Sequence, residues 1–134
     1  MKEVEVKARI RDQATFLTAL EEAGITLGQP VRQEDRIDAE TDVVVFPAVH
    51  AGRHFLRIRT QDDGRILFTY KSPVTGHQDK IEHELEISDA NVMDQIIRRL
   101  PFYEYVRLGK TRQTAHAGDY ELCFDQIDGV GTFC

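Results

Sequence analysis

The sequence feature that most constrains the fold is a strict alternation of charged and apolar residues at the start of the chain. The odd positions from 3 to 11 are Glu, Glu, Lys, Arg and Arg, and the even positions from 4 to 10 are Val, Val, Ala and Ile. Alternation with a period of two is typical of a β-strand with one charged and one apolar face. The pattern therefore predicts a first strand, although ordinary solvated strands are built in the same way.

Similar alternation returns in later segments that are bounded by turn signals. Asp62, Asp63 and Gly64 form a hairpin signal between two predicted strands, at residues 55–59 and 66–71. Pro47 places a further predicted strand, at residues 43–47, on the edge of a sheet, because proline cannot donate a ladder hydrogen bond. The remaining predicted strands lie at residues 80–87, 105–114 and 120–127.

Two segments between these strands have helical periodicity. The first has an apolar stripe within residues 16–23, with Asp12 as its cap and Gly24 as its stop. The second covers residues 92–100, begins after Ser88 or Asp89 and ends at Pro101. Hairpin-linked strands with two interposed helices predict an α+β fold with a dominant antiparallel sheet.

The charged faces of the predicted strands carry like charges two residues apart, and they carry both signs. Like charges so placed repel unless a ligand or a countercharge lies between them. One interpretation is a single sheet that is wet on its charged side and packed by helices on the other. A closed barrel with a charged lumen, filled by a polyanion and its metal ions, explains the whole set better. The residues are Glu3, Glu5, Lys7 and Arg9; Arg57, Arg59, Thr69 and Lys71; Lys80, Glu82, Glu84 and Glu86; Lys110, Arg112, Glu121 and Asp125.

Length and composition exclude several other classes of protein. The 134 residues predict one domain, and the formal net charge of -6 argues against a sequence-independent nucleic-acid clamp, which needs a basic surface. Cys123 and Cys134 lack the spacing of a zinc motif and fit a reducing cytosol, so a cytoplasmic location is expected. No apolar run reaches the length of a membrane span, and the first residues do not form a signal peptide.

The charged residues also fall into an ordered set of motifs. These are Glu3-x-Glu5-x-Lys7, Gln33-x-Asp35, the segment 56–59, the segment 69–73, Glu82-x-Glu84-x-Glu86 followed by 87–89, Lys110-x-Arg112 and the segment 124–133. As a set, covering nearly the whole chain, they resemble the CYTH domain, the fold of the triphosphate tunnel metalloenzymes. That family includes class IV adenylate cyclases, thiamine triphosphatases and inorganic triphosphatases.

The resemblance implies a single CYTH-like domain over residues 1–134, built as an antiparallel β-barrel, the triphosphate tunnel, with helices packed outside. It implies Mg²⁺ or Mn²⁺ as the cofactor and Glu3, Glu5 and Lys7 as catalytic residues. The phosphate-binding residues that it implies are Lys7, Arg57, Arg59, Lys71, Lys110 and Arg112. The metal-binding residues that it implies are Glu3, Glu5, Glu82, Glu84, Glu86 and Asp125.

Two departures from the family pattern are visible. The family has an aromatic pair between the acids of its second motif, where this chain has Arg36 and Ile37. The family pattern also continues beyond its last motif with a Glu-x-Glu strand, whereas this chain ends at Cys134. The expected barrel is therefore incomplete at its C-terminus, and an unpaired edge of this kind favours a homodimer.

The expected function is that of a metal-dependent cyclase or phosphohydrolase acting on a nucleoside, thiamine or inorganic triphosphate. A cyclase directs the ribose 3′-hydroxyl at the α-phosphorus, and a triphosphatase directs water at the terminal phosphorus, so the sequence leaves both reactions open. The alternative is a non-catalytic module that binds a nucleotide or polyphosphate. The expected partner is a small-molecule triphosphate, with no nucleic acid and no membrane.

Overall fold

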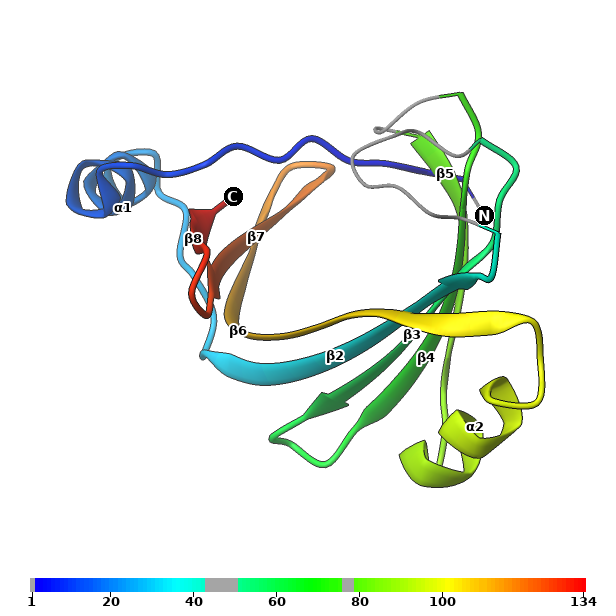
Figure 1. Ribbon diagram of the computed structural model, residues 1–134. Coiled ribbons are helices and arrows are strands. Elements are labelled where there is room, and N and C mark those ends of the chain that lie inside the picture. Colours follow the sequence, from blue (N-terminus) through cyan, green and yellow to red (C-terminus); the bar gives the residue numbers. More distant parts are fainter. Residues whose placement is uncertain (1, 43–50, 76–78) are drawn as a thin grey trace. The chain divides into compact units, whose positions relative to one another are not determined.

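The structure of the chain is a computed structural model, which describes residues 2–42, 51–75 and 79–134 and, for residues 2 and 3, the backbone alone (Figure 1). Its elements are β1 (Lys2–Val4), α1 (Gln13–Glu22), β2 (Val31–Glu40), β3 (Phe55–Gln61), β4 (Ile66–Pro73), β5 (Asp79–Glu86), α2 (Ala90–Ile97), β6 (Phe102–Ala117), β7 (Tyr120–Ile127) and β8 (Gly131–Phe133). The chain divides into two compact units. Unit 1 comprises Met1–Val6 and Glu34–Arg107, and unit 2 comprises Lys7–Gln33 and Leu108–Cys134.

Unit 1 is built on the hairpin of β3 and β4, which continues into β5 and β1. The pairings of β3 with β4, β4 with β5 and β5 with β1 are all antiparallel. Helix α2 lies along one face of this sheet, where Ile97 is 1% exposed and packs with Leu56 and Ile58 of β3 (Figure 1). The helix begins where Asp89 accepts a hydrogen bond from the backbone N–H of Val92 at 2.9 Å. The alternation in β3 and β4 therefore produces an apolar face under α2 and a polar face opposite it.

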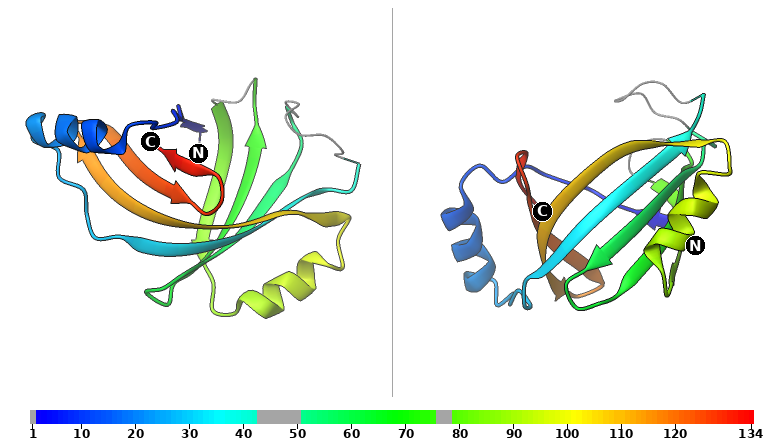
Figure 2. Two further views of the ribbon diagram at one scale, coloured as in Figure 1. Left: turned by 60° about the vertical axis from the view of Figure 1, so that its left-hand side comes forward. Right: turned by 60° about the horizontal axis from the view of Figure 1, so that its bottom comes forward.

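Unit 2 contains the antiparallel ladder of β6, β7 and β8 (Figure 2). Residues near the chain start run along the other side of β8, since Ala8 and Cys134 exchange backbone hydrogen bonds of 2.8 and 2.9 Å. Helix α1 begins at Asp12, which accepts from the N–H of Thr15 at 3.0 Å. Its Phe16 ring stacks on Phe124 of β7 with 5.8 Å between the ring centroids.

The predicted α+β class with a dominant antiparallel sheet is confirmed, and so are both helices with the caps Asp12 and Asp89. The hairpin of β3 and β4 turns at residues 62–64 as predicted, and β7 has the predicted bounds. The strand predicted at residues 43–47 lies outside the described residues. No helix in the described part of the chain is long and apolar enough to cross a membrane.

Several elements differ from the prediction in their bounds: α2 ends at Ile97 and not at residue 100, and β6 covers Phe102–Ala117 and not only residues 105–114. Three strands differ more strongly. The first strand is not continuous over residues 3–11, because β1 ends at Val4 and only Arg9 forms a further bridge, to Phe133. Strand β2 was not predicted, since its sequence carries charge on both faces and shows no apolar period. The short strand β8 was not predicted as a separate strand. It follows a turn at Gly129, whose φ of 69° lies in the left-handed region that glycine adopts readily.

Candidate functional site

The polar side of unit 1 gathers the predicted site residues of three neighbouring strands. In the registers, Arg57 of β3 pairs with Thr69 of β4, and Thr69 pairs in turn with Glu84 of β5. Two residues further along the same strands, and therefore on the same face, Lys71 lies opposite Glu82. Directly paired residues project from the same face of a sheet. These five residues therefore share the face opposite α2, and we refer to them as the unit 1 polar face.

The centre of the unit 1 polar face is a three-way contact around Arg57. Its Nη2 atom donates to Thr69 Oγ1 at 3.1 Å and to Glu84 Oε1 at 3.2 Å. The Thr69 hydroxyl donates to the same carboxylate oxygen of Glu84 at 2.8 Å. The Arg57 side chain is only 13% exposed, whereas that of Glu84 is 39% exposed. The cation is thus buried at the sheet surface while its carboxylate partner reaches the solvent.

Arg57 is incompletely satisfied in this environment. Its Nε atom is buried and has no hydrogen-bond partner among the described residues. Burial lowers the pKa of Arg57, the nearby Arg59 lowers it further, and Asp35 and Glu84 oppose the change. A buried N–H without an acceptor costs free energy, and an anion at the site removes that cost.

Arg59 has a different environment from Arg57. Its Nε and Nη2 atoms donate to the two carboxylate oxygens of Asp35, each at 2.8 Å. The side chains are 5% and 2% exposed, so this is a buried, two-pronged ion pair. Asp35 lies on β2, the strand that was not predicted, and it was not among the predicted site residues. The only signal for it was its place in the Gln33-x-Asp35 motif.

The other predicted residues of unit 1 form ion pairs along β5. Lys71 lies 3.4 Å from Glu82, and both side chains are about one-fifth exposed, at 22% and 20%. Glu86 lies 3.4 Å from Arg65, with both side chains more than half exposed. Glu5 lies 3.4 Å from Lys80. The backbone of Glu3 pairs with Lys80, but its side chain lies outside the described part of the structure.

The predicted site residues of unit 2 form a separate cluster around Asp125 of β7, whose side chain is 1% exposed. Arg112 of β6 donates to both of its carboxylate oxygens at 2.7 Å, and Lys110 lies 3.6 Å away. Burial alone raises the pKa of Asp125, but the hydrogen bonds of Arg112 and the charges of Lys110 and Lys7 outweigh it and lower the pKa. Asp125 is therefore held as a carboxylate between cations.

The side-chain atoms that could bind a divalent metal ion in this structure are carboxylate oxygens. Among the described residues, no group of three or more His, Cys, Asp and Glu side chains is arranged to hold a metal. Glu82 and Glu84, however, place two carboxylates on one face of β5, beside the cations of the unit 1 polar face. Mg²⁺ is commonly bound by one or two carboxylates together with substrate phosphates and water. The donors therefore fit an ion that arrives with a phosphate ligand.

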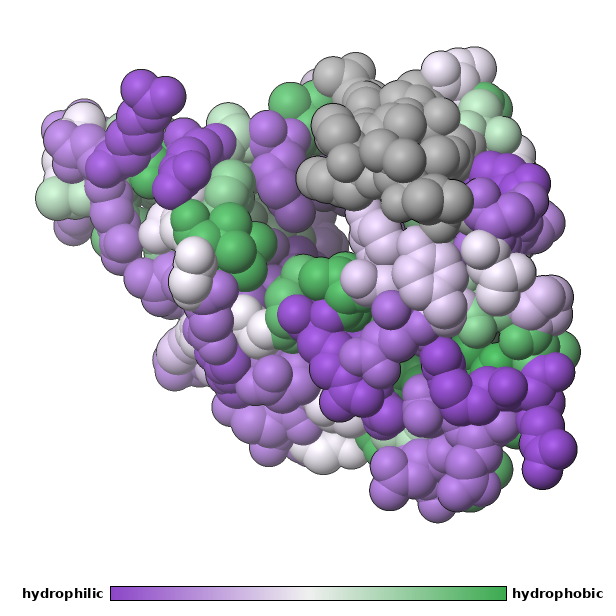
Figure 3. Space-filling model, viewed as in Figure 1, coloured by the Kyte–Doolittle hydropathy of each residue, from purple (hydrophilic) through white to green (hydrophobic). Residues whose placement is uncertain are grey.

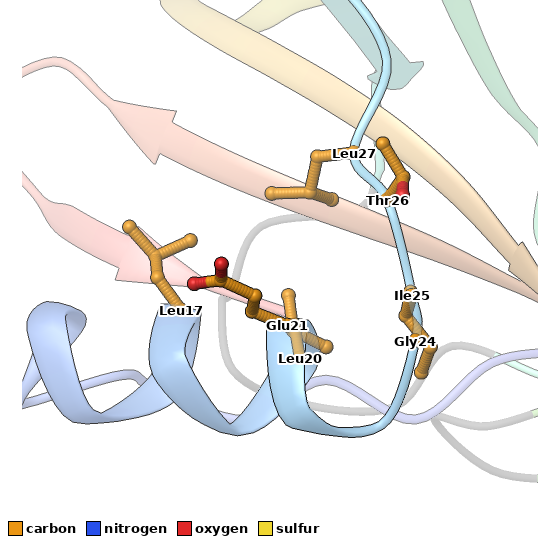
Figure 4. Close-up of a pocket in the computed structure, with 7 residues that line it drawn as sticks. All are labelled: Leu17, Leu20, Glu21, Gly24, Ile25, Thr26 and Leu27. Atoms are coloured by element: carbon orange, nitrogen blue, oxygen red, sulfur yellow. The ribbon is translucent and has the colours of Figure 1, made fainter.

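Unit 2 also contains a pocket. It has a volume of about 340 Å³ and is formed by α1 and the loop that follows it. Figure 4 shows Leu17, Leu20 and Glu21 of the helix turned toward the segment of Gly24 to Leu27. None of the predicted site residues lines this pocket, and its mostly apolar lining does not suit a polyphosphate.

The visible surface is largely hydrophilic, with smaller hydrophobic areas (Figure 3). At the place of α2, purple and green areas adjoin, which agrees with half-exposed Val92 and Ile96 on that helix. Singly exposed apolar residues of this kind are normal on protein surfaces. The charged clusters described above are therefore the stronger candidates for function.

Comparisons with known proteins agree with the motifs and the fold. The CYTH domain family matches residues 1–134. A protein named "Putative adenylate cyclase MJ0240" from Methanocaldococcus jannaschii is 32% identical over 142 residues, which cover 99% of this chain and 74% of that protein. The chain therefore belongs to the CYTH family, as the sequence motifs predicted.

Two solved structures share the fold. A conserved hypothetical protein from Pyrococcus furiosus is 25% identical with a TM-score of 0.78, and the match covers 98% of this chain and 75% of that one. The PH1012 protein from Pyrococcus horikoshii is 22% identical with a TM-score of 0.79, and the match covers 98% of this chain and 74% of that one. The mostly antiparallel β architecture with two helices is thus the family fold.

Proposed function

We propose that the chain binds a triphosphate together with Mg²⁺ or Mn²⁺ and acts on it as an adenylate cyclase or a triphosphatase. The proposal rests on membership of the CYTH family and on the relative from Methanocaldococcus jannaschii, whose name is "Putative adenylate cyclase MJ0240". It also rests on the chemistry of the unit 1 polar face. Polyphosphate oxygens suit two-pronged guanidinium contacts and the point charge of lysine.

The single observation that supports this proposal most strongly is the buried Nε of Arg57, which has no hydrogen-bond partner in the part of the chain that the structure describes. Its neighbour Arg59 is satisfied by Asp35, so the two arginines of one strand are not equivalent. A phosphate oxygen is the acceptor that completes Arg57, and Lys71 on the adjacent strand adds a second positive charge. In this proposal Arg57 is the main phosphate ligand of unit 1, and Arg59, which is two residues further along the same strand and paired with Asp35, supports the site.

A divalent ion would be held by Glu82 and Glu84, and the predicted roles of Glu3, Glu5, Glu86 and Asp125 remain proposals. Such an ion supplies neutralisation of the phosphate charge and polarisation of the phosphorus–oxygen bonds. The residues of the chain bind and orient the phosphates, which is most of what phosphoryl transfer requires of a protein. The predicted catalytic roles of Glu3, Glu5 and Lys7, and phosphate contacts by Lys110 and Arg112, belong to the same proposal.

The proposal is compatible with two reactions. In the cyclase reaction the ribose 3′-oxygen bonds to the α-phosphorus, the bond to the bridging oxygen breaks, and pyrophosphate leaves. In the triphosphatase reaction a water oxygen bonds to the terminal phosphorus, the bond from that phosphorus to its bridging oxygen breaks, and the diphosphate leaves while orthophosphate is released. The name of the relative favours the cyclase.

The test is a product assay on the chain with ATP, thiamine triphosphate and inorganic triphosphate, each with Mg²⁺ and with Mn²⁺. Cyclic AMP with pyrophosphate from ATP identifies the cyclase, and orthophosphate identifies the triphosphatase. An Arg57→Ala variant is expected to lose the activity, while an Arg107→Ala variant, altered at an exposed arginine that pairs with Glu104, retains it. No product and no binding with all three compounds would overturn the proposal.

A non-catalytic binding module is the second candidate. It is favoured by the observation that Glu82, Glu84 and Asp125 each already contact a cation. Carboxylates that are engaged in this way are less available to a metal ion. Binding of a triphosphate without turnover under every metal condition would select this candidate.

A further inference from the structure

The sheet of unit 1 also has a group of titratable side chains on the face that carries α2. Tyr70 of β4 pairs with Leu56 of β3, which packs with Ile97 of α2, so Tyr70 projects from this face. The Nδ1 atom of His54 and the hydroxyl oxygen of Tyr70 lie 2.5 Å apart. The other ring nitrogen of His54, Nε2, lies 3.5 Å from Oε1 of Glu40. The three side chains thus form a series of carboxylate, imidazole and phenol.

The ring of Tyr70 is held between two histidines. Its centroid is 5.4 Å from that of His54, with 38° between the ring planes. His83 of β5 is the direct cross-strand partner of Tyr70, and its ring stacks on Tyr70 at 6.0 Å and 29°. Tyr70 also packs against the core that includes Leu56 and Ile58. The position of the phenol is therefore set by its packing, with the hydroxyl directed at His54.

Glu40 is fixed beside His54 by two further contacts. Its Oε1 atom accepts a hydrogen bond from the backbone N–H of His54 at 2.8 Å, and its carboxylate forms an ion pair with Arg53. A carboxylate beside Nε2 favours the neutral imidazole that carries its hydrogen on Nε2, which leaves Nδ1 as an acceptor. The hydroxyl of Tyr70 is then the donor to Nδ1.

This arrangement has the parts of an activated nucleophile. A hydroxyl group is a weak nucleophile until a base within hydrogen-bond reach takes its proton, and a third group commonly orients that base. Tyr70 supplies the hydroxyl, His54 the base and Glu40 the orienting carboxylate. The side chain of His54 is 50% exposed, so a small molecule can approach the phenol oxygen from the solvent.

We propose that Tyr70 is a site of covalent acylation by acyl donors with a good leaving group, with His54 as the general base and Glu40 as a positioning residue. The oxygen of Tyr70 bonds to the acyl carbon while its proton passes to Nδ1 of His54. The bond from the acyl carbon to the leaving group then breaks, and the leaving group departs with the bonding electrons and takes the proton from His54. The products are acyl-tyrosine, the protonated leaving group and neutral imidazole.

The test is acetylation of the chain by N-acetylimidazole, followed by peptide mapping with mass spectrometry. Tyr120 of β7 is the internal comparison, since it is 75% exposed whereas Tyr70 is half-buried. If exposure alone set the rates, Tyr120 would react faster. With His54 as its base, Tyr70 is expected to react at least about tenfold faster than Tyr120. Acetylation of Tyr70 at the rate of Tyr120 or more slowly would overturn the inference.

The two histidines beside Tyr70 provide a matched pair of variants. His54→Gln removes the base and is expected to lower the rate at Tyr70 by about tenfold or more. His83→Gln alters the ring that stacks on Tyr70 and is expected to leave that rate within about twofold. Equal losses in the two variants would show that packing, and not a base, sets the reactivity of Tyr70, and this too would overturn the inference.

Glu40→Gln tests the carboxylate at nearly constant volume. It is expected to lower the rate at Tyr70 by about threefold or more and to leave the rate at Tyr120 unchanged. Thermal unfolding of each variant establishes that it is folded before its rates are compared. The ratio of the rates at Tyr70 and Tyr120 in the unaltered chain needs no variant, so it tests the inference even where a variant does not fold. The site uses no residue of the unit 1 polar face, so its failure would leave the proposed function standing.

Discussion

The two units of the chain use the same residue types in opposite ways. On the unit 1 polar face, Arg57 contacts one oxygen of a carboxylate that is 39% exposed, and its buried Nε has no partner among the described residues. In unit 2, Arg112 engages both oxygens of Asp125, which is 1% exposed. The first arrangement leaves one N–H of a buried cation without an acceptor among the described residues, whereas the second neutralises its own charges.

This difference shows that a row of alternating charges does not by itself define a binding site. What distinguishes the units is the register, which sets a threonine between Arg57 and Glu84 but places Arg112 directly opposite Asp125. With a residue between them, the guanidinium and the carboxylate meet at only one oxygen. As direct neighbours, they close a two-pronged pair.

The largest effect on stability is expected in unit 2. Asp125→Ala leaves the buried Lys110 and Arg112 without their carboxylate, and breaking a buried pair in this way costs about 3–5 kcal/mol. The free energy of unfolding from urea titration measures the loss. Asp128→Ala removes an exposed partner of Arg32 in the same unit and is expected to change the free energy of unfolding much less. Equal losses in the two variants would refute the buried role of Asp125.

A smaller effect is expected at the centre of the unit 1 polar face. Thr69 is 0% exposed, and Thr69→Val keeps its volume but removes the hydroxyl that links Arg57 to Glu84. The expected loss is about 1–2 kcal/mol in the free energy of unfolding, because Arg57 loses an acceptor in a buried place.

The control for this variant is Thr114→Val, at a half-buried threonine of β6, with an expected change within about 0.5 kcal/mol. A Thr69→Val variant that is as stable as the unaltered chain and binds inorganic triphosphate equally well would show that the hydroxyl does not position Arg57.

The smallest expected effects concern the pH dependence of stability. The contributions of Asp125 in unit 2 and of Asp38 in unit 1 are expected to change with pH in opposite directions. The pKa of Asp125 is lowered, so its contribution is present above about pH 4 and is lost as the pH falls through the lowered pKa. Asp38 in unit 1 is 0% exposed; burial raises its pKa, and the hydrogen bond from Arg98 only partly opposes this. Its contribution is therefore present at acid pH and is lost as the pH rises through the raised pKa.

Urea unfolding at a series of pH values checks this pair of expectations. The free energy of unfolding of the unaltered chain minus that of Asp125→Asn is expected to decrease toward acid pH. The corresponding difference for Asp38→Asn is expected to decrease as the pH rises. Two differences of the same sign would contradict the assigned environments.

The sequence predicted the elements whose signals are local and missed those that depend on distant partners. The turn at residues 62–64 and the caps Asp12 and Asp89 follow from residue types within a few positions. The pair of Arg59 and Asp35 joins residues that are 24 positions apart and on different strands. Nothing in the alternation distinguishes Arg59 from Arg57, so the unequal roles of the two arginines required the register.

The most direct test of the contrast between the two units is calorimetric titration of inorganic triphosphate with Mg²⁺ into Arg57→Ala and Arg112→Ala side by side. Removal of charge-assisted hydrogen bonds predicts a loss of about thirty- to hundredfold in affinity for Arg57→Ala and less than about tenfold for Arg112→Ala. Unchanged affinity in Arg57→Ala, or a larger loss in Arg112→Ala, would contradict the assignment of the unit 1 polar face as the principal phosphate-binding site.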